Sequence, residues 1–327
     1  MNFFKAAMPR HKIRIKVLPL LLLSLFPFAP NLSASISIDN FTPATNNRFA
    51  NNASFIGSGV DFSGVGRTSN ATNRKWATLI GPNIFLSATH WHPAIGQTVR
   101  FYPDNDPSSV FVERTVTSGV QLNGSDLWIG AFDYALPATI KQYDYATINL
   151  SAATFLASSY YKDNVLMSGI SPTTTGYGAS GYTNQAVGQN QAEGFIDNQS
   201  VGGSTGDVIV TVKNQPSDST YGYTYRTYEA QAASGDSGSP LFSTDSGTPL
   251  LLGIAWAIGT TDIDPNPVTT VTRNISIYSY TGQHTGAIEA FYNANVIPEP
   301  SSIILFGVAI LFGVGRRFGM TSKKCNG

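Results

Sequence analysis

The chain has 327 residues, and its 20 Lys and Arg balance its 20 Asp and Glu, so the formal net charge is zero. This balance excludes the strongly basic surface of nucleic-acid-binding proteins, and we expect no nucleic-acid partner. Charged residues make up only 12 % of the chain, about half the usual share, which agrees with export. Because Cys325 is the single cysteine, the chain cannot form a disulfide within itself. We predict no cofactor and no metal site.

Residues 1–34 have the pattern of a secretory signal peptide. Basic residues at positions 5, 10, 12, 14 and 16 precede an apolar run over 17–29, and Leu32-Ser33-Ala34 offers small residues for cleavage. Residues 35–63 are polar and rich in Asn, Ser and Thr, and we interpret them as a lead-in segment. We therefore expect export and processing by a signal peptidase.

From Trp76 onward, short runs rich in β-branched and aromatic residues alternate with turn residues, and each run predicts a strand. The predicted strands are 76–80, 84–88, 98–102, 110–116, 127–132, 165–168, 192–196, 208–212, 221–228, 250–257 and 275–280. Residues 176–206 are rich in Gly, Asn and Gln, and we interpret them as long loops. One helix is predicted at 286–294, where Ile288, Phe291 and Tyr292 share one face. This pattern indicates an all-β sandwich or barrel.

The stretch Ser234–Pro240, which reads Ser-Gly-Asp-Ser-Gly-Ser-Pro, has the residue types of a nucleophilic turn. Gly235 has no Cβ, so the backbone can turn sharply there and leave its N–H pointing into a cavity. Ser237 projects from the turn, and two such N–H groups beside one hydroxyl make an oxyanion hole next to a nucleophile. Because Gly- and Ser-rich chains form ordinary turns with the same letters, the motif requires a base and an acid elsewhere.

Four histidines could supply the base, namely His11, His90, His92 and His284. His11 lies in the N-terminal basic segment. His90 follows the apolar run Ile84–Leu86 through small residues, which predicts an imidazole at the end of a buried strand. His92 lies two residues further on and is the weaker candidate.

Three segments resemble the signatures of chymotrypsin-like (trypsin-like) serine proteases. The stretch Leu86–Trp91 resembles their Leu-Thr-Ala-Ala-His-Cys signature, and Ser234–Pro240 resembles their Gly-Asp-Ser-Gly-Gly-Pro signature. Between them, Asp126–Phe132 is similar to their Asp-Ile-Ala-Leu-Leu-Lys-Leu stretch. The order His, Asp, Ser along the chain is that of this superfamily.

The resemblance covers about residues 64–295 and implies a double six-stranded Greek-key β-barrel, split near 155–165, with a short C-terminal helix. It further implies a serine endopeptidase that cleaves protein or peptide substrates. His90 would be the base, Asp126 the acid that orients it, and Ser237 the nucleophile. The N–H groups of Gly235 and Ser237 would form the oxyanion hole. Asp144 also stands at the start of a strand-like stretch and is the alternative acid.

The resemblance also implies a substrate pocket. Its base would lie six residues before the serine, at Gln231, and Trp256 and Ala257 would line it. Because Gln231 is neutral, we expect no strong preference for Arg or Lys. Relatives that mature from zymogens bury a freshly cut Ile or Val amine against the acid before the serine, which here is Asp236. Ile36 could be such a terminus, but no activation site is evident.

The chain departs from the family pattern at three positions, none of which removes an atom of the triad. Thr89 replaces an alanine, Trp91 replaces a cysteine that normally carries a disulfide, and Ser239 replaces a glycine.

Two other classes of protein stay open on the sequence alone. An α/β-hydrolase esterase would use Ser237, then Asp262 or Asp264, then His284, but its nucleophile needs a strand, a turn and a helix. Here a proline and a strand-like run follow the serine. The second class is a catalytically inactive, protease-like surface or adhesion protein that keeps the triad residues.

Residues 296–327 have the organisation of a sorting signal. Pro298-Glu299-Pro300 precedes an apolar segment at 303–315 and then Arg316-Arg317. The apolar segment is shorter than the roughly 17–25 residues of a full membrane span, and the arginines fit the positive-inside rule. The order resembles the PEP-CTERM sorting signal of Gram-negative bacteria. That resemblance implies transient anchoring at the inner membrane and removal by an exosortase, and the alternative is a retained C-terminal anchor.

Overall fold

The computed structural model describes residues 35–68, 74–157, 163–172, 181–264, 266 and 268–297. The predicted signal peptide and the segment that begins at Pro298 lie outside these residues. Within the described ranges, no helix combines the length and apolar character that crossing a membrane would require.

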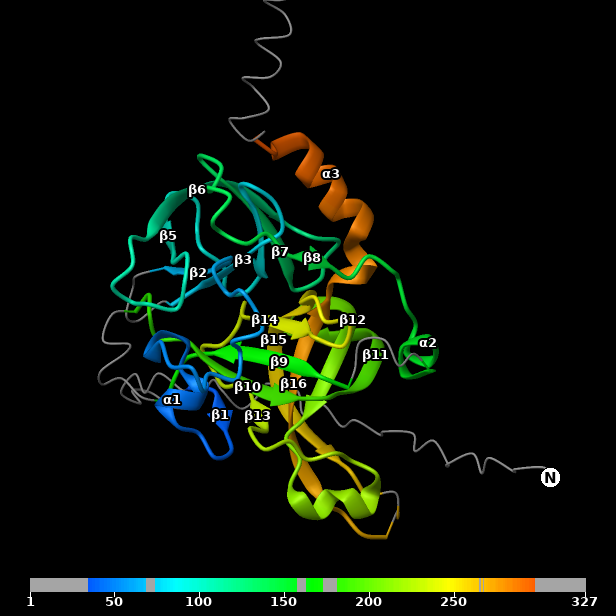
Figure 1. The fold of residues 1–327 in the computed structure, drawn as a ribbon. Coiled ribbons are helices and arrows are strands. Elements are labelled where there is room, and N and C mark those ends of the chain that lie inside the picture. Colours follow the sequence, from blue (N-terminus) through cyan, green and yellow to red (C-terminus); the bar gives the residue numbers. More distant parts are fainter. Residues whose placement is uncertain are drawn as a thin grey trace, which may run out of the picture.

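Strands β2 to β7 close into one barrel, which forms the first half of the fold (Figure 1). The order around the barrel is β2-β3-β4-β7-β6-β5. The strands are β2 (Val65–Thr68), β3 (Trp76–Leu79), β4 (Ile84–Ala88), β5 (Thr98–Phe101), β6 (Val112–Gln121) and β7 (Leu127–Phe132). A cluster of buried apolar side chains fills the interior. In it, Phe132 stacks on Phe85 with the ring centroids 4.4 Å apart, and it packs edge-on against Phe101 with the centroids 5.6 Å apart. Closure leaves the barrel no free strand edge.

The second half is an eight-stranded sheet with the order β10-β9-β14-β15-β16-β12-β11, and β8 pairs with β15 in parallel. Its strands are β8 (Asp144–Tyr145), β9 (Val165–Gly169), β10 (Ala186–Asn190), β11 (Ala192–Val201), β12 (Ser204–Val212), β14 (Pro240–Ser243), β15 (Leu250–Asp262) and β16 (Thr272–Tyr280). It therefore has more strands than the six expected. In Figure 1 it lies below the barrel, and β15 and β16 extend into a long ribbon.

Two predictions of local structure in this half were wrong. The segment 176–206 was interpreted as long loops, but 186–190, 192–201 and 204–206 form strands, of which only 192–196 had been predicted, and 176–180 lie outside the described residues. Polar side chains are accommodated in the sheet where they are buried with partners. For example, Asn190 Nδ2 donates to the carbonyls of Val212 at 3.1 Å and Ala230 at 2.7 Å. The tyrosine run at 221–228 is not a strand, because the 3₁₀ helix η2 (Pro216–Tyr221) and turns occupy this stretch.

The lead-in segment packs closely against both halves. Strand β1 (Ser37–Ile38) pairs with β13 (Ala230–Gln231). The short helix α1 (Pro43–Asn46) and the 3₁₀ helix η1 (Arg48–Ala50) follow. Arg48 is buried, and its Nη2 donates to the carbonyl of Tyr102 at 3.0 Å in the first barrel.

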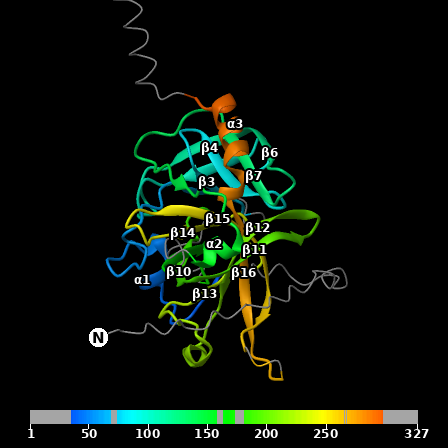
Figure 2. The ribbon, with the colours of Figure 1, turned by 90° about the vertical axis from the view of Figure 1, so that its right-hand side faces the viewer.

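The C-terminal helix α3 (Thr285–Asn295) follows the 3₁₀ helix η3 (Thr281–His284) and packs against the barrel. Its predicted apolar face is confirmed, because Ile288 is buried and Phe291 and Tyr292 pack against the same core. At its end, Asn83 Nδ2 donates to the carbonyl of Asn295 at 2.9 Å. Figure 2 shows α3 running along the barrel from the direction of the second sheet.

The all-β class and the short C-terminal helix are therefore confirmed. Besides α3, the described residues contain the short helices α1 and α2 (Ala152–Ala157), neither of which the sequence predicted.

Candidate active site

The serine turn, residues Ser234–Pro240, lies against the end of strand β4. Gly238 has a φ of 88°, and a Cβ on it would lie 2.9 Å from the Oγ of Ser87, so glycine permits this close approach. The N–H of Gly238 donates to the carbonyl of Ala255 at 2.9 Å, and the N–H of Ala255 donates to the carbonyl of Ser239 at 2.8 Å. These contacts hold the turn between the first barrel and strand β15.

The pairing of β4 with β7 brings His90 and Asp126 together. Ala88 pairs with Leu127 in this antiparallel ladder, and the N–H of Thr89 then donates to the carbonyl of Asp126 at 2.7 Å. The residues just beyond the end of β4 therefore face the residue just before β7. His90 N–H donates to Asp126 Oδ1 at 3.1 Å.

The imidazole of His90 connects the carboxylate to the serine. Its Nδ1 lies 2.7 Å from Asp126 Oδ2, and its Nε2 lies 2.9 Å from Ser237 Oγ. The Asp126 side chain is only 1 % exposed, whereas that of His90 is 45 % exposed. Burial raises the pKa of Asp126 above its ordinary value, while the hydrogen bonds from His90 act in the opposite direction. A hydroxyl, a base and a buried acid thus form one hydrogen-bonded line.

The backbone around Ser237 has the donors that an oxyanion hole needs. Gly235 has a φ of 102°, a conformation that glycine adopts without strain. Within the described ranges, neither the N–H of Gly235 nor that of Ser237 donates to any acceptor. The N–H of Asp236, by contrast, donates to the carbonyl of Ala233 at 3.0 Å. Two amide donors are therefore left beside the serine hydroxyl.

Asp236 is buried beneath the turn and connects it to strand β9. Its Oδ1 accepts from the N–H of Ile170 at 2.7 Å, and its Oδ2 accepts from the N–H of Ala233 at 2.8 Å. Burial raises the pKa of Asp236 to about 7, and these hydrogen bonds and the charge of Arg67 act in the opposite direction.

The three residues predicted to line a substrate pocket lie on two strands of the second half. Gln231 is in β13, where it pairs with Ser37 and is partly exposed. Trp256 and Ala257 follow Ala255 in β15, at a bulge in its pairing with β16. Trp256 is 6 % exposed and packs in an apolar cluster. The structure thus brings β15 beside the serine turn, and the role of these side chains in specificity stays a prediction.

The alternative acids lie apart from His90. Asp144 is exposed in β8, which pairs with β15 at Leu250. Asp262 and Asp264 lie at the tip of the β15–β16 ribbon, where Asp262 Oδ1 accepts from the N–H of Asp264 at 3.1 Å. In the described residues, none of these three carboxylates bonds to a histidine.

The other described histidines do not reach Ser237. His92 stacks on Trp128 at 4.2 Å, and its Nδ1 lies 3.0 Å from the carbonyl of Pro93. His284 is buried with no partner for either ring nitrogen among the described residues. Because strand β14 follows Ser237 where an α/β-hydrolase requires a helix, the esterase alternative is not supported.

Sequence reasoning missed Arg67 of strand β2, which lies fully buried between the two halves. Its Nη1 donates to the carbonyl of Asn184, and its guanidinium lies 4.2 Å from the ring centre of Trp76. No local signal marks this arginine, because its partners come from distant parts of the chain.

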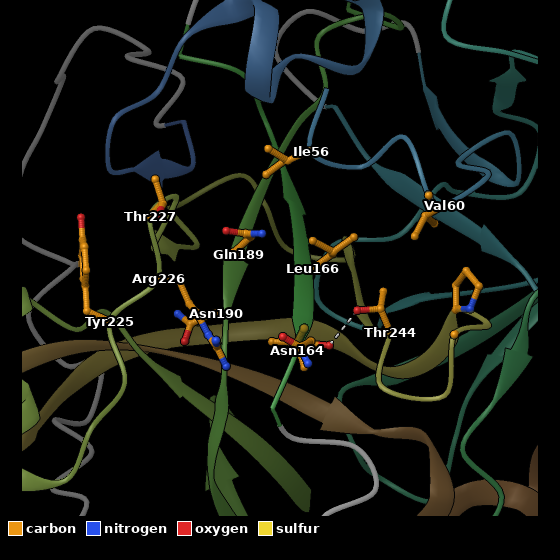
Figure 3. A pocket seen from close by; sticks show the side chains of 14 residues that line it. Ile56, Val60, Asn164, Leu166, Gln189, Asn190, Tyr225, Arg226, Thr227 and Thr244 are labelled. Carbon is orange, nitrogen blue, oxygen red and sulfur yellow. Dashed lines mark hydrogen bonds between the residues drawn. The ribbon is translucent and has the colours of Figure 1, made fainter. Parts of the chain in front are cut away.

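A separate cavity of about 520 Å³ lies at the far ends of β9 and β14 from the serine turn. Its floor includes the cross-strand pair Leu166 and Gln189, with Thr227 and Thr244 on its walls (Figure 3). None of the triad residues lines it. Among the described residues, no group of three or more His, Cys, Asp and Glu side chains could hold a metal ion.

Comparison with known proteins finds no family model and no curated protein that matches the chain. Among solved structures, the chain is similar to human heparin binding protein, with 13 % identity, a TM-score of 0.44, and coverage of 73 % of this chain and 95 % of that one. It is also similar to an inactivated protease paralogue from the scabies mite, with 14 % identity, a TM-score of 0.44, and coverage of 73 % and 99 %. Similarity at this level carries no inference about activity.

Proposed function

We propose that the chain is an exported serine endopeptidase. The observation that carries this proposal is the line of contacts from Asp126 through His90 to Ser237, with heavy-atom distances of 2.7 and 2.9 Å. Both distances lie within the reach required for a base that activates a nucleophile.

In the proposed mechanism, His90 Nε2 takes the proton of Ser237 as Oγ attacks the carbonyl carbon of a peptide bond. Asp126 holds the imidazole in the required tautomer and stabilises the imidazolium. The N–H groups of Gly235 and Ser237 stabilise the negative oxygen of the tetrahedral intermediate. His90 then returns the proton to the leaving amine, and water hydrolyses the acyl-enzyme by the same steps in reverse.

The expected substrates are proteins or peptides met outside the cytoplasm. Gln231, Trp256 and Ala257 would line the primary pocket, and the neutral Gln231 would give no strong preference for Arg or Lys. Processing by a signal peptidase and by an exosortase would place the domain in the cell envelope or outside a Gram-negative cell, after transient anchoring at the inner membrane. These steps rest on the sequence patterns of the two termini.

Labelling with a fluorophosphonate probe tests the proposal. The purified protein should form a covalent adduct that maps to Ser237, and Ser237→Ala and His90→Ala should abolish it, because the probe needs an activated serine. Asp144→Ala serves as the matched control and should label like the wild type. If the folded wild type fails to label under any condition, the chain is instead a non-catalytic protein with a protease-like site.

A further inference from the structure

Trp91, one of the three departures from the family pattern, directly follows His90 in the chain. Its backbone N–H donates to the carbonyl of Ala88 at 3.1 Å, which fixes it at the end of strand β4. Its indole Nε1 donates to the carbonyl of Arg74 at 3.1 Å. The indole therefore lies against the segment of the first barrel that leads into strand β3.

Lys75 lies over the ring of Trp91. Its Nζ is 5.4 Å from the ring centroid, which is within the range of a cation–π contact. Strand β2 holds the backbone of Lys75, because its N–H donates to Thr68 Oγ1 at 3.1 Å and its carbonyl accepts from the N–H of Thr68 at 3.0 Å. Arg74, Lys75 and the indole of Trp91 thus form one surface, which we call the cationic platform.

The two cations of this platform have no anion within the protein. Within the described ranges, no ion pair includes Arg74 or Lys75, and Arg74 Nε is buried without a hydrogen-bond partner. The preceding residues, 69–73, contain no Asp or Glu. The nearby carboxylate of Asp126 is bonded to His90. Burial lowers the pKa of both Arg74 and Lys75, and a carboxylate from outside the chain would offset this cost of their charges.

The platform approaches the serine turn from the side of the first barrel. The N–H of Gly238 in the turn donates to the carbonyl of Ala255 in β15. A Cβ on the same glycine would lie 3.3 Å from the carbonyl oxygen of Trp91. The turn therefore contacts both β15, which contains two of the residues predicted to line the substrate pocket, and the residue that carries the indole of the platform.

The proposed reaction places the leaving peptide near His90. This histidine has to return a proton to the leaving amine, so the amine must come within hydrogen-bond reach of Nε2. The peptide on the carboxyl side of the cleaved bond would then extend over His90 and its chain neighbour Trp91, whereas the acyl part would extend towards β15. An extended peptide advances about 3.3 Å per residue, so its first two residues would cover a distance of roughly 7 Å from the amine.

We propose that the cationic platform is a specificity site that selects an Asp or Glu among the first two residues after the cleaved bond. The substrate carboxylate pairs chiefly with the ammonium of Lys75, so recognition is by complementary charge. This inference rests on the proposed function and deepens it, because it names a substrate class for the same serine site. Arg74 and Lys75 determine specificity and take no part in the chemical step.

The cleavage sites in a peptide library of random sequence test the proposal. The full-length exported protein is incubated with the library, and mass spectrometry identifies the new N-termini. In the wild type, Asp and Glu should be enriched about threefold or more at the first or second position after the cleaved bond, and the enrichment should weaken at high salt. Lys75→Arg should keep this preference. Lys75→Glu should replace it with a preference for Lys or Arg at the same positions.

Lys141 offers a matched control. It is also partly buried and has no ion pair within the described ranges, but its N–H donates to Ser63 Oγ at 2.8 Å, near the opposite end of β2 from Thr68. Lys141→Glu should therefore give the wild-type profile. A loss of the acidic preference in Lys141→Glu as large as in Lys75→Glu would mean that net charge, and not the platform, sets the preference.

Two peptides that differ only by Asp or Asn at the preferred position separate charge from shape. The ratio of their kcat/KM values should be about three or more in the wild type and close to one in Lys75→Gln, because the amide keeps the shape but has no charge. Each ratio is measured within one enzyme, so it does not depend on the folded fraction.

Failure of this inference differs from failure of the proposed function. A wild type that cleaves peptides without any enrichment of acidic residues would overturn the inference, and so would an unchanged ratio in Lys75→Gln. In both cases the proposed endopeptidase would stand. If the folded wild type cleaves no peptide of the library, the proposed function fails, and this inference fails with it.

Discussion

The Asp126 carboxylate is almost completely buried and accepts two hydrogen bonds from His90, one from Nδ1 and one from the backbone N–H. An amide at this position keeps the shape but cannot hold the same tautomer of His90, because its Nδ2 group is a donor. Among single residues, Asp126 therefore gives the most specific prediction about turnover.

Asp126→Asn should lower turnover about 10⁴-fold, as in other triads, with little effect on folding. Asp144→Asn is the matched control, since Asp144 is exposed and pairs with Leu250 of β15, and it should leave turnover unchanged. The measurement is kcat on a peptide substrate, with thermal unfolding as the check on structure. A fully active Asp126→Asn would mean that another group orients His90.

The sequence could predict the positions of His90 and Ser237 because a contiguous signature surrounds each of them. Asp126 was harder to distinguish from Asp144, because a single acid before an apolar run occurs twice. The ladder register of β4 and β7 distinguishes the two, and that register depends on long-range pairing. Arg67 could not be predicted, since a lone arginine in a strand acquires its environment only from the folded partner segments.

At the scale of elements, the end of strand β9 is the part that the serine turn depends on. Gly169 closes this strand between Ile36 and Asp236 with no room for a side chain. Its neighbour Ile170 supplies one of the two donors to the Asp236 carboxylate. A substitution in β9 should therefore alter the position of Ser237, although the strand contains no proposed catalytic residue.

Gly169→Ala should destabilise the fold by about 1–3 kcal/mol, because the new methyl group would overlap Ile36 and Asp236. It should also slow probe labelling per folded molecule by displacing Asp236. The matched control is Gly59→Ala, where the structure has no atom within 4 Å of the added Cβ and the change should be within about 0.5 kcal/mol. Denaturant unfolding measures the first effect, and equal stability of the two variants would contradict it.

Strands β3, β4, β5 and β7 could be predicted closely, because their apolar runs are short and bounded by turn residues, whereas β6 runs further than predicted and β2 was not predicted. Strand β10 was missed, and only 192–196 of β11 was predicted, for the opposite reason. Their buried positions include Asn190 and glycines, and the side chain of Asn190 is satisfied by carbonyls of β12 and β13. Composition alone cannot distinguish such a satisfied amide from one in a loop.

At the scale of the whole molecule, buried acids should set the pH dependence of stability. Burial raises the pKa of Glu229 to about 8, and it raises that of Glu193 well above its ordinary value. The two carboxyl groups share Asn214 as a donor, through its N–H and its Nδ2. The folded state thus holds protons that the unfolded chain releases above about pH 4.5.

The free energy of unfolding should therefore fall as the pH rises from about 5 to 8, because the unfolded state binds fewer protons than the folded state in that window. Melting temperature against pH measures the trend. Glu229→Gln cannot ionise, so its melting temperature should depend less on pH, whereas Glu113→Gln at an exposed ion pair should follow the wild type. A melting temperature that rises between pH 5 and 8 would contradict the prediction.

The hydrogen bonds between Asn83 and the end of helix α3 determine how the domain would be oriented if its C-terminal end were tethered. Ile297 donates its N–H to Asn83 Oδ1 at 2.9 Å, so the described chain is held against the barrel up to that residue. Asn83 immediately precedes β4, and His90 lies just past the other end of the same five-residue strand. Such a strand spans about 17 Å. A membrane that held the tail would therefore lie on the side of the barrel where β4 begins. The imidazole of His90, at the opposite end of this strand, would face away from the membrane, towards substrates in the surrounding solution.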